Sequence, residues 1–317
     1  MPLRAAAVIK RPVLLHRLTG LSAVEFAQVL PTFAQTYEQH VVQPRLVSPT
    51  RVRALGGGLK GALPEVADKL LFILVYVRVY PLLFVQGLAF GMAESKACTW
   101  VNVLLPVLDE TLGQQHVRPT RAKGHTLEDI IVAFPELHEL GVLTDGTERP
   151  VRRPKDTTRQ HVEYSGKKKR HTRKYVTVTH PTTQYILAVS EEAAGSRHDK
   201  QILDDAHLSC TSDLLVQADT GFQGLAIGHA VIRTPHKRKR KKKGEPKDEL
   251  TPTQKADNTE LAAARIAIEH SNAGFKRNRS ISEVLRNTRA GTSDLLALIA
   301  MGLHNLRVLS RASYQIP

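Results

Sequence analysis

The order of strands and helices after residue 138 constrains the fold of this chain more than any other feature. The stretch "HTRKYVTVTH", residues 171–180, alternates polar with β-branched and aromatic residues, and "QYILAVS", residues 184–190, follows it after a turn. Before this pair, "LHELGVLTDGTERP" predicts a strand that ends near Asp145, where Asp-Gly starts a turn. Three strands in succession therefore open the second half of the chain.

Helices and strands alternate after these three strands. Residues 195–208 predict a helix with Ser196 and Asp199 at capping-box spacing, and "SDLLVQAD" predicts a short strand that ends in Asp219. A further strand, a long lysine-rich loop and a strong helix complete the order. Three meandering strands followed by alternating helices and strands fit a ribonuclease H-like α/β domain, which we place at residues 138–317.

The first part of the chain is predicted to be helical. Residues 1–60 are expected to form a helical and basic segment, in which a helix capped by Ser22 is interrupted near Pro31. Residues 61–115 predict three helices with a glycine turn before the third, a pattern typical of helix-turn-helix DNA-binding domains. Residues 116–137 are predicted to connect this domain to the α/β domain.

The third of these helices, in "AESKACTWVNVLLPVLDETL", has an apolar side that can face the core of the domain. Its other side carries polar side chains that suit phosphate or base-edge contacts, namely Ser95, Lys96, Thr99 and Asn102. Most helical triplets of this kind are plain bundles. The prediction of DNA binding therefore depends on this surface together with the net charge.

The net charge favours a polyanionic partner. The 317 residues include 45 Lys and Arg against 30 Asp and Glu, a formal net charge of +15, so we expect double-stranded DNA first and an anionic membrane surface second. The apolar run at 70–90 is broken by Arg78 and Pro81, which argues against a membrane span. Two distant cysteines, Cys98 and Cys210, suggest neither a disulfide framework nor a cysteine zinc site, so we expect a reducing, intracellular compartment. The N-terminal "MPLRAAAVIKRPVLLHRL" lacks a continuous apolar core followed by a cleavage site, so we expect no signal peptide.

Two aspartates, Asp145 and Asp219, close predicted strands and precede turns. Side chains at such positions project from a sheet edge and are held by a rigid element, which suits a reacting centre. For each aspartate alone, ordinary turn chemistry is the more common explanation, because Asp before Gly or Thr-Gly is frequent in turns.

The predicted helix around "RIAIEHSNAGFK", residues 265–276, carries a further carboxylate. At about 100° per residue, one narrow wedge of this helix contains Arg265, Glu269, Asn272 and Lys276. Hydrophobic residues flank this polar stripe on both sides, whereas a solvated face of ion pairs normally lies opposite the apolar residues. We therefore expect the stripe to lie at the edge of the core and to face a site, with a ladder of ion pairs as the alternative.

Convergence of Asp145, Asp219 and Glu269 would require cations. Carboxylates that gather repel one another, and their pKa values rise unless positive charge intervenes. Oxygen ligands favour Mg²⁺ or Mn²⁺, and two such ions would activate a water or a 3′-hydroxyl and stabilise the leaving oxygen of a phosphodiester. Asp199 is a secondary candidate near the ions, whereas His198 is expected to begin a helix.

A set of motifs spreads over the second half of the chain: "LTDGTERPVRRP", "YSGKKKRHT", "GSRHDK", "ADTGFQGL", "PHK" with Asn258 and "RIAIEHSNAGFK", and the terminal "LHN". Together they resemble the DDE transposases of bacterial insertion sequences, specifically the group usually called the fifth insertion-sequence family, which are distant relatives of the eukaryotic Harbinger transposases. The resemblance covers about residues 138–306. The region before residue 115 resembles the helix-turn-helix domain of these enzymes more loosely.

The resemblance implies a catalytic triad of Asp145, Asp219 and Glu269 that binds two Mg²⁺ or Mn²⁺ ions. It implies hydrolysis of phosphodiesters at the terminal inverted repeats of a mobile element, followed by transfer of the 3′-OH ends into target DNA. A homodimer on DNA is expected because two ends must be cut together. The implied location is the cytoplasm of a bacterium, in association with the nucleoid.

The signature of that family around the glutamate is Tyr, two residues, Arg, three residues, Glu, six residues, Lys. Arg265, Glu269 and Lys276 fit this spacing, and Ala262 stands where the tyrosine would be. The resemblance implies that Arg265 and Lys276 hold DNA phosphates near the scissile bond. Asn272 is expected to orient the glutamate.

Two basic stretches lie near the predicted carboxylates in the sequence. Residues 149–174 contain eleven Lys or Arg and two acidic residues, and "HKRKRKKK" at 236–243 lies between the second aspartate and the glutamate. We expect them to bind DNA phosphates with little sequence preference, with solvated loops as the alternative. The specific candidates are Lys167, Lys168, Lys169 and Arg170.

Two other functions stay open. The chain could be a catalytically inactive helix-turn-helix DNA-binding protein, either a regulator or a decayed transposase copy. It could also be a ribonuclease or repair nuclease of the same fold, although such an enzyme would not need the N-terminal helical domain. The three carboxylates and the signature spacing favour the transposase.

Overall fold

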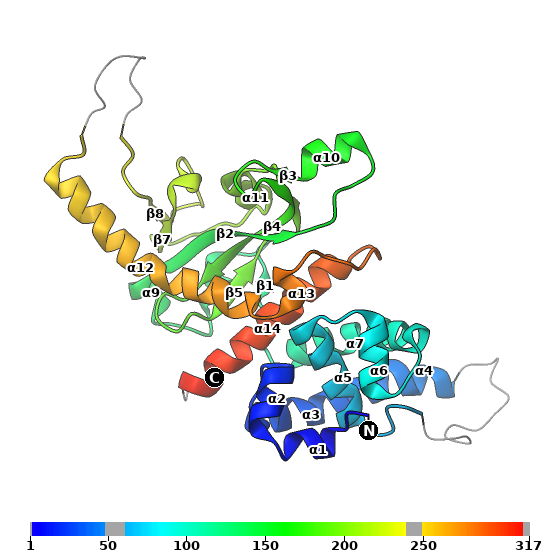
Figure 1. Cartoon of the computed structure of the whole chain (residues 1–317). Coiled ribbons are helices and arrows are strands. Elements are labelled where there is room, and N and C mark those ends of the chain that lie inside the picture. The colour runs from blue at the N-terminus through cyan, green and yellow to red at the C-terminus, as the bar shows by residue number, and fades with distance from the viewer. Residues whose placement is uncertain (1, 48–60, 239–248, 313–317) are drawn as a thin grey trace. The chain divides into compact units, whose positions relative to one another are not determined.

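The structure, a computed structural model, describes residues 2–47, 61–238 and 249–312 (Figure 1). The chain divides into two compact units. The helical unit contains Met1–Arg118 and Phe275–Arg311, and the sheet unit contains Pro119–Gly274 and Ala312–Pro317. The segment Phe275–Arg311, which the sequence places in one domain with residues 138–274, therefore packs with the N-terminal helices.

The regular structure of the helical unit is helical throughout its described residues. Its elements are α1 (Ala5–Ile9), α2 (Pro12–Thr19), α3 (Ala23–Tyr37), the π-helix η1 (Glu38–Val42), α4 (Gln43–Leu46), α5 (Val66–Val79), α6 (Leu83–Phe90), α7 (Glu94–Gln114), α13 (Arg279–Ser282) and α14 (Thr292–Ala312). The capping box at Ser22 and Glu25 begins α3, as predicted. The predicted interruption near Pro31 is wrong, because α3 continues to Tyr37. Its buried face, which includes Phe26 and Phe33, offsets the hydrogen bond that proline removes.

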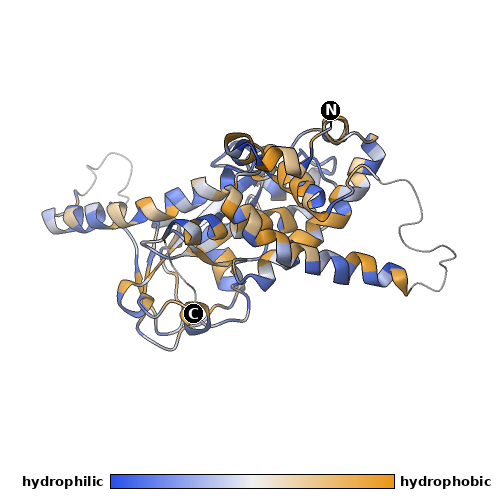
Figure 2. Ribbon diagram, turned by 90° about the horizontal axis from the view of Figure 1, so that it is seen from below, coloured by the Kyte–Doolittle hydropathy of each residue, from blue (hydrophilic) through white to orange (hydrophobic). Residues whose placement is uncertain are grey.

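Helix α5 is enclosed by the rest of the helical unit. All residues from Leu70 to Val77 are buried, so this helix is apolar on every side. It ends at Tyr80, which takes the left-handed conformation (φ 49°) before Pro81. Figure 2 shows the contrast in hydropathy between such buried stretches and the polar faces of other helices. In the described ranges, no helix combines the length and the apolar character that a membrane span requires.

Helices α6 and α7 form the predicted pair around a glycine turn. Gly91 ends α6 in the left-handed region (φ 72°), and a Cβ at Gly87 would lie 2.6 Å from the carbonyl oxygen of Met92. The turn can therefore approach α6 only because residue 87 lacks a side chain. Helix α7 buries Ala97 and Val101, as the predicted core side requires.

The sheet unit is built on one eight-stranded sheet in its described residues. The strands are β1 (Thr120–Arg121), β2 (Val142–Pro150), β3 (Tyr164–Ser165), β4 (Arg170–Thr179), β5 (Ile186–Val189), β6 (Ala193–Ala194), β7 (Leu215–Ala218) and β8 (Val231–Arg233). They run in the order β1-β5-β4-β2-β7-β8, with β3 and β6 paired to β4. Pairs β2–β4 and β4–β5 are antiparallel, and β1–β5, β2–β7 and β7–β8 are parallel. The helices are α8 (Leu127–Ile131), α9 (Leu137–Leu140), α10 (Thr157–Glu163), α11 (Asp199–Asp205), the 3-10 helix η2 (Thr220–Phe222) and α12 (Pro252–Lys276).

The predicted succession of strands and helices is confirmed by β2, β4, β5, α11, β7, β8 and α12. This mixed α/β architecture is consistent with the expected ribonuclease H-like fold. Two local predictions are wrong. β2 does not end near Asp145 but continues to Pro150, because β4 pairs with it as far as Thr172. The N-cap of α11 is His198 and not Ser196, so the predicted capping box with Asp199 does not form.

Candidate active site

The register of β2 and β7 brings two aspartates together. Thr144 of β2 pairs with Ala218 of β7, and this is the last pair between the two parallel strands. Asp145 and Asp219 each follow a member of that pair, so they lie at the same level at the point where β7 ends. The sequence prediction that the two aspartates converge is therefore supported by the sheet itself.

Local hydrogen bonds fix the carboxylate of Asp219. It is the N-cap of η2, and its Oδ1 accepts a hydrogen bond of 2.6 Å from the backbone N–H of Gly221. A capping aspartate has few rotamers that keep this bond, so the side chain is held in place before any ligand binds.

A third carboxylate, that of Asp199 at the start of α11, lies against the backbone of β2 beside Asp145. A Cβ built on Gly146 would lie 2.4 Å from Cγ of Asp199, so only glycine allows this approach. Lys174 on β4 is nearly buried, and its Nζ lies 3.2 Å from Oδ1 of Asp199 and donates to the carbonyl oxygen of Arg197. The sequence ranked Asp199 as a secondary candidate, and its motif "GSRHDK" was the signal.

The cluster is electrostatically strained. The pKa of Asp145 is raised from 3.8 to about 6, first by burial, then by the nearby carboxylate of Asp219 and to a smaller extent by Asp199. Arg265 and the backbone N–H of Gly146 act in the opposite direction. Among these carboxylates, Asp145 is therefore the one whose ionised form is disfavoured by burial and by the neighbouring negative charges.

Helix α12 supplies the groups that oppose this charge. Nδ2 of Asn272 donates a hydrogen bond of 3.1 Å to Oδ2 of Asp145, and Nη2 of Arg265 lies 4.0 Å from Oδ2 of Asp219. Two further atoms of these side chains, Nε of Arg265 and Oδ1 of Asn272, are buried without a hydrogen-bond partner among the described residues. From the sequence we expected Asn272 to orient Glu269, but in the structure the side chain of Asn272 donates its hydrogen bond to Asp145.

Glu269 lies on the same face of α12, between Arg265 and Asn272 in the helical sequence. Its side chain is exposed, and in the described part of the chain no group of three or more His, Cys, Asp or Glu side chains is close enough to hold a metal ion. The flanks of the polar stripe explain this position. Ile268 is fully buried, whereas Ile266 is 50 % exposed, so the stripe follows the boundary between core and solvent and is not enclosed on both sides.

The donor set nevertheless suits a hard divalent cation. The carboxylates of Asp145, Asp219 and Asp199 offer oxygen ligands, and a cation beside them would offset both the burial of Asp145 and the repulsion from Asp219 that raise its pKa. The buried Oδ1 of Asn272, which lacks a partner, is one more oxygen of the same kind beside them. No sulfur or imidazole group is needed to complete such a site.

Comparison with known proteins identifies the family. Residues 144–305 match the family described as "DDE superfamily endonuclease". The chain belongs to the DDE superfamily endonucleases. Residues 61–114 match the family described as "Helix-turn-helix of DDE superfamily endonuclease". The chain is also 28 % identical over 247 residues to a protein of Microchaete diplosiphon named "Probable transposase for insertion sequence element IS702". The aligned region covers 78 % of this chain and 82 % of that protein. No solved structure matches the chain.

The other residues predicted to bind DNA lie in three parts of the chain: the start of β4 with the turn before it, helix α7, and the end of α12. The turn between β3 and β4 carries exposed side chains, namely Lys167, Lys168, Lys169 and Arg170. Ser95, Lys96 and Thr99 are exposed on α7, while Asn102 is half-buried and donates to Sγ of Cys98. Lys276 is half-buried in the last turn of α12.

The basic stretch at 236–243 is described only as far as residue 238; its remainder lies outside the described residues. Its described start is tied to the site. The backbone N–H of His236 donates to Oδ1 of Asn258 (2.8 Å), whose Nδ2 donates back to the carbonyl oxygen of His236 (3.1 Å). Nζ of Lys237 donates to the carbonyl oxygen of Thr220, the residue after Asp219. Sequence reasoning did not single out Lys237, although "PHK" was among the motifs of the resemblance.

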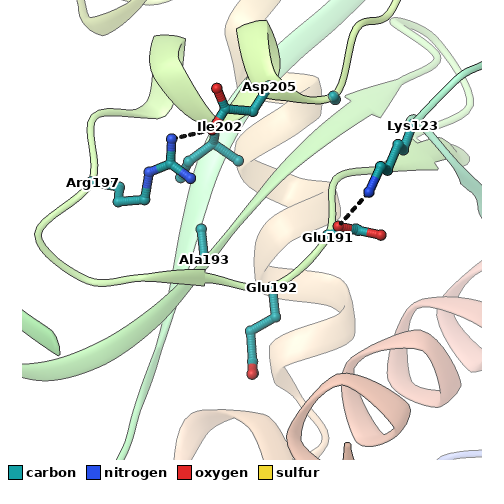
Figure 3. A pocket seen from close by; sticks show the side chains of 8 residues that line it. Lys123, Glu191, Glu192, Ala193, Arg197, Ile202 and Asp205 are labelled. Atoms are coloured by element: carbon teal, nitrogen blue, oxygen red, sulfur yellow. Dashed lines mark hydrogen bonds and ion pairs between the residues drawn. The ribbon is translucent and has the colours of Figure 1, made fainter. Parts of the chain in front are cut away.

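A pocket of the sheet unit whose lining does not include Asp145 or Asp219 carries paired charges (Figure 3). Lys123 pairs with Glu191 at 3.5 Å, and Arg197 pairs with Asp205. The two cations that line this pocket are therefore each partnered by a carboxylate.

Proposed function

We propose that this chain is a transposase that hydrolyses phosphodiesters at the terminal inverted repeats of its mobile element and transfers the 3′-OH ends into target DNA. One observation carries the proposal: the register of β2 and β7 sets Asp145 beside Asp219, where Arg265 and Asn272 contact them. The family match and the relative named as a probable transposase support it. The motifs of the sequence favour the fifth insertion-sequence family.

Divalent metal ions are the cofactors that this family typically uses. Asp145, Asp219 and Glu269 would hold two Mg²⁺ or Mn²⁺ ions, with Asp199 as an additional oxygen donor beside them. When bound, the ions supply positive charge that activates the attacking oxygen and stabilises the leaving oxygen of the phosphodiester.

The side chains of the protein prepare this site. Asn272 holds Oδ2 of Asp145 and so fixes the orientation of that carboxylate. Arg265 stands over Asp219 with part of its guanidinium unpartnered, which suits it to take up a phosphate of the bound DNA. Lys174 holds Asp199 against β2, so the third carboxylate cannot swing away from the pair.

The two predicted domains would have different functions, DNA recognition and catalysis. Residues 61–115, the helix-turn-helix domain, would bind the terminal inverted repeats through Ser95, Lys96, Thr99 and Asn102. The domain at 138–317 would cut and join DNA, and the basic residues 167–170 would hold its phosphates. Two ends must be cut in one complex, so we propose a homodimer on DNA at the nucleoid.

A second function has one observation in its favour. Glu269 is exposed and, among the described residues, does not form with Asp145 and Asp219 a group of three carboxylates close enough to hold a metal ion. A decayed copy or a regulator would bind DNA with the helix-turn-helix domain and leave the carboxylates unused. The two functions differ in whether Glu269 moves onto the aspartate pair when DNA and metal ions bind.

Cleavage of DNA carrying the inverted repeats that flank the coding region separates the two functions. The wild-type protein should cut this DNA only with Mg²⁺ or Mn²⁺, and Asp145→Asn and Glu269→Gln should abolish cleavage while binding is retained. Asp213→Asn, at an exposed aspartate of the same unit, is the matched control. Cleavage that persists in both site variants would refute the transposase assignment, and a wild-type protein that binds but never cuts would favour the regulator.

A further inference from the structure

Four arginines of the helical unit, none of them on α7, act on one another electrostatically. Arg307 on α14 is only 8 % exposed, and Arg311 lies one helical turn after it. Arg78 lies in the last turn of α5, and Arg277 follows the end of α12. We call these four residues the arginine cluster.

Direct contacts anchor the half-buried member of the cluster. Nη1 of Arg78 donates a hydrogen bond of 2.6 Å to the carbonyl oxygen of Arg277. The stem of the same side chain crosses the end of α2, where a Cβ at Gly20 would lie 3.4 Å from Cδ of Arg78. Arg78 is therefore held in place, with its guanidinium beside the chain segment that carries Arg277.

The members of the cluster repel one another. The pKa of Arg307 is lowered to about 10, first by burial and then by the charges of Arg311, Arg277 and Arg78. Burial also lowers the pKa of Arg78, followed by the charge of Arg277. A pKa of about 10 still leaves Arg307 charged at neutral pH, so the fold keeps all four positive charges together at a cost.

Little negative charge compensates this group. Glu25 is the carboxylate that acts on Arg307 in the opposite direction, and its Oε2 already accepts the backbone N–H of Ser22 in the cap of α3. Within the described ranges, none of the four arginines forms an ion pair with a carboxylate. A buried charge without such a partner is costly, and it persists where a ligand supplies the partner.

A phosphodiester is the ligand that best fits the chemistry of the arginine cluster. Guanidinium groups bind phosphate oxygens through two parallel hydrogen bonds and are more weakly hydrated than ammonium groups, so they tolerate partial burial. A polyanion can meet several such groups at once. The same unit contains the match to the helix-turn-helix family, whose residues 61–114 include Arg78.

We propose that the arginine cluster, Arg78, Arg277, Arg307 and Arg311, binds the sugar-phosphate backbone of duplex DNA as a contact site built by elements other than α7. The proposal rests on the proposed function in that the duplex is the DNA that the transposase holds. Base recognition is left to α7, and the cluster fixes the position of the backbone.

The test measures binding of the full-length protein to a labelled duplex of arbitrary sequence in EDTA, where no cleavage occurs. The variants are Arg277→Gln and Arg311→Gln, alone and combined, because both side chains are exposed and the substitution should leave the fold intact. The control is Arg289→Gln, at another exposed arginine of the same unit. Loss of two phosphate contacts should reduce the slope of log affinity against log salt by about 1.8, at about 0.9 per contact, and weaken binding at about 0.1 M salt by at least about tenfold. The control should bind like the wild type.

A second measurement separates binding from a structural role. Without DNA, the double variant should unfold at a temperature equal to or above that of the wild type, because a repulsion has been removed. A lower unfolding temperature together with weaker binding would overturn the proposal. So would unchanged duplex affinity and salt slope in the double variant, even if inorganic phosphate stabilises the wild type, because the site would then bind small anions only. Neither outcome bears on Mg²⁺-dependent cleavage, so failure here is distinct from failure of the transposase assignment.

Discussion

Replacing Asp145 with asparagine should stabilise the metal-free protein at neutral pH and lose this advantage in acid. The pKa of Asp145 is raised from 3.8 to about 6, first by burial and then by Asp219. The charged form is therefore disfavoured in the folded state by about 2 pKa units, or about 3 kcal/mol at 1.36 kcal/mol per unit. Asparagine keeps the shape of the side chain and removes the charge.

The sign follows from proton binding. Below about pH 4 the carboxyl is protonated in both the folded and unfolded states, so its charge costs nothing. Between pH 4 and pH 6 the folded state holds more protons than the unfolded state, and the wild-type protein loses stability as the pH rises. Above about pH 7 the full penalty is present. The stability of the variant lacks this pH dependence.

Hydrogen bonds reduce the gain. Asp145 accepts from Nδ2 of Asn272 and from the backbone N–H of Gly146, and the single oxygen of an asparagine can replace only part of this. A lost hydrogen bond costs about 1 kcal/mol, which leaves about 2 kcal/mol of net stabilisation at pH 8. For a unit of this size that is roughly 4–8 °C in Tm, at about 2–4 °C per kcal/mol.

The assay is chemical and thermal unfolding in EDTA at several pH values between 5 and 8, with Asp213→Asn as the matched control. The difference in unfolding free energy between variant and wild type should grow by roughly 1.5 kcal/mol over this range. A difference that is negative at every pH, or that is the same at pH 5 and pH 8, would refute the reasoning that gathered charge strains the site.

Three further predictions follow from close contacts. Gly146→Ala should lower the free energy of unfolding by about 1–3 kcal/mol in a urea titration, because the new Cβ would meet the carboxylate of Asp199 at 2.4 Å. Asn272→Ala should raise the pKa of Asp145 by removing a donor to its charged form, so the pH profile of cleavage should move to higher pH; an unshifted profile would count against this role. Gly87→Ala should disturb the turn between α6 and α7 and weaken duplex binding without changing the unfolding of the sheet unit, as followed by anisotropy and hydrogen exchange.

The convergence of Asp145 and Asp219 could be predicted because each aspartate precedes a turn signal after a predicted strand, and β7 does end directly before Asp219. What the sequence could not provide is that β2 continues beyond Asp145. Parallel pairing with β7 stops at Thr144, but antiparallel pairing with β4 carries the strand on to Pro150. A turn signal records local preference, and a neighbouring strand overrides it when it can pair with the same residues.

The sequence ranked Glu269 above Asp199, but it could not show which of the two lies against the backbone beside Asp145. Helical periodicity predicts which face of α12 carries Glu269, but it does not predict which other elements pack against that face. In the structure this side chain is exposed. Asp199 enters the site because glycine at 146 lets a side chain approach the backbone of a strand far away in sequence. Likewise, no local pattern indicates that Phe275–Arg311 packs with the N-terminal helices, because such packing depends on contacts over long sequence distances.

The charges around the aspartate pair suggest how a site can be kept folded before its ions arrive. Arg265 stands near Asp219, Lys174 holds Asp199, and Asp145 has only the amide of Asn272 as a side-chain hydrogen-bond donor among the described residues. The two carboxylates with cationic neighbours are thus partly compensated, whereas the pKa of Asp145 rises to about 6. The remaining cost of an ionised carboxylate falls on Asp145, and a divalent ion beside it would release most free energy there. Binding of the ion and completion of the site by Glu269 would then be coupled, because the exposed glutamate has reason to approach only after positive charge is in place.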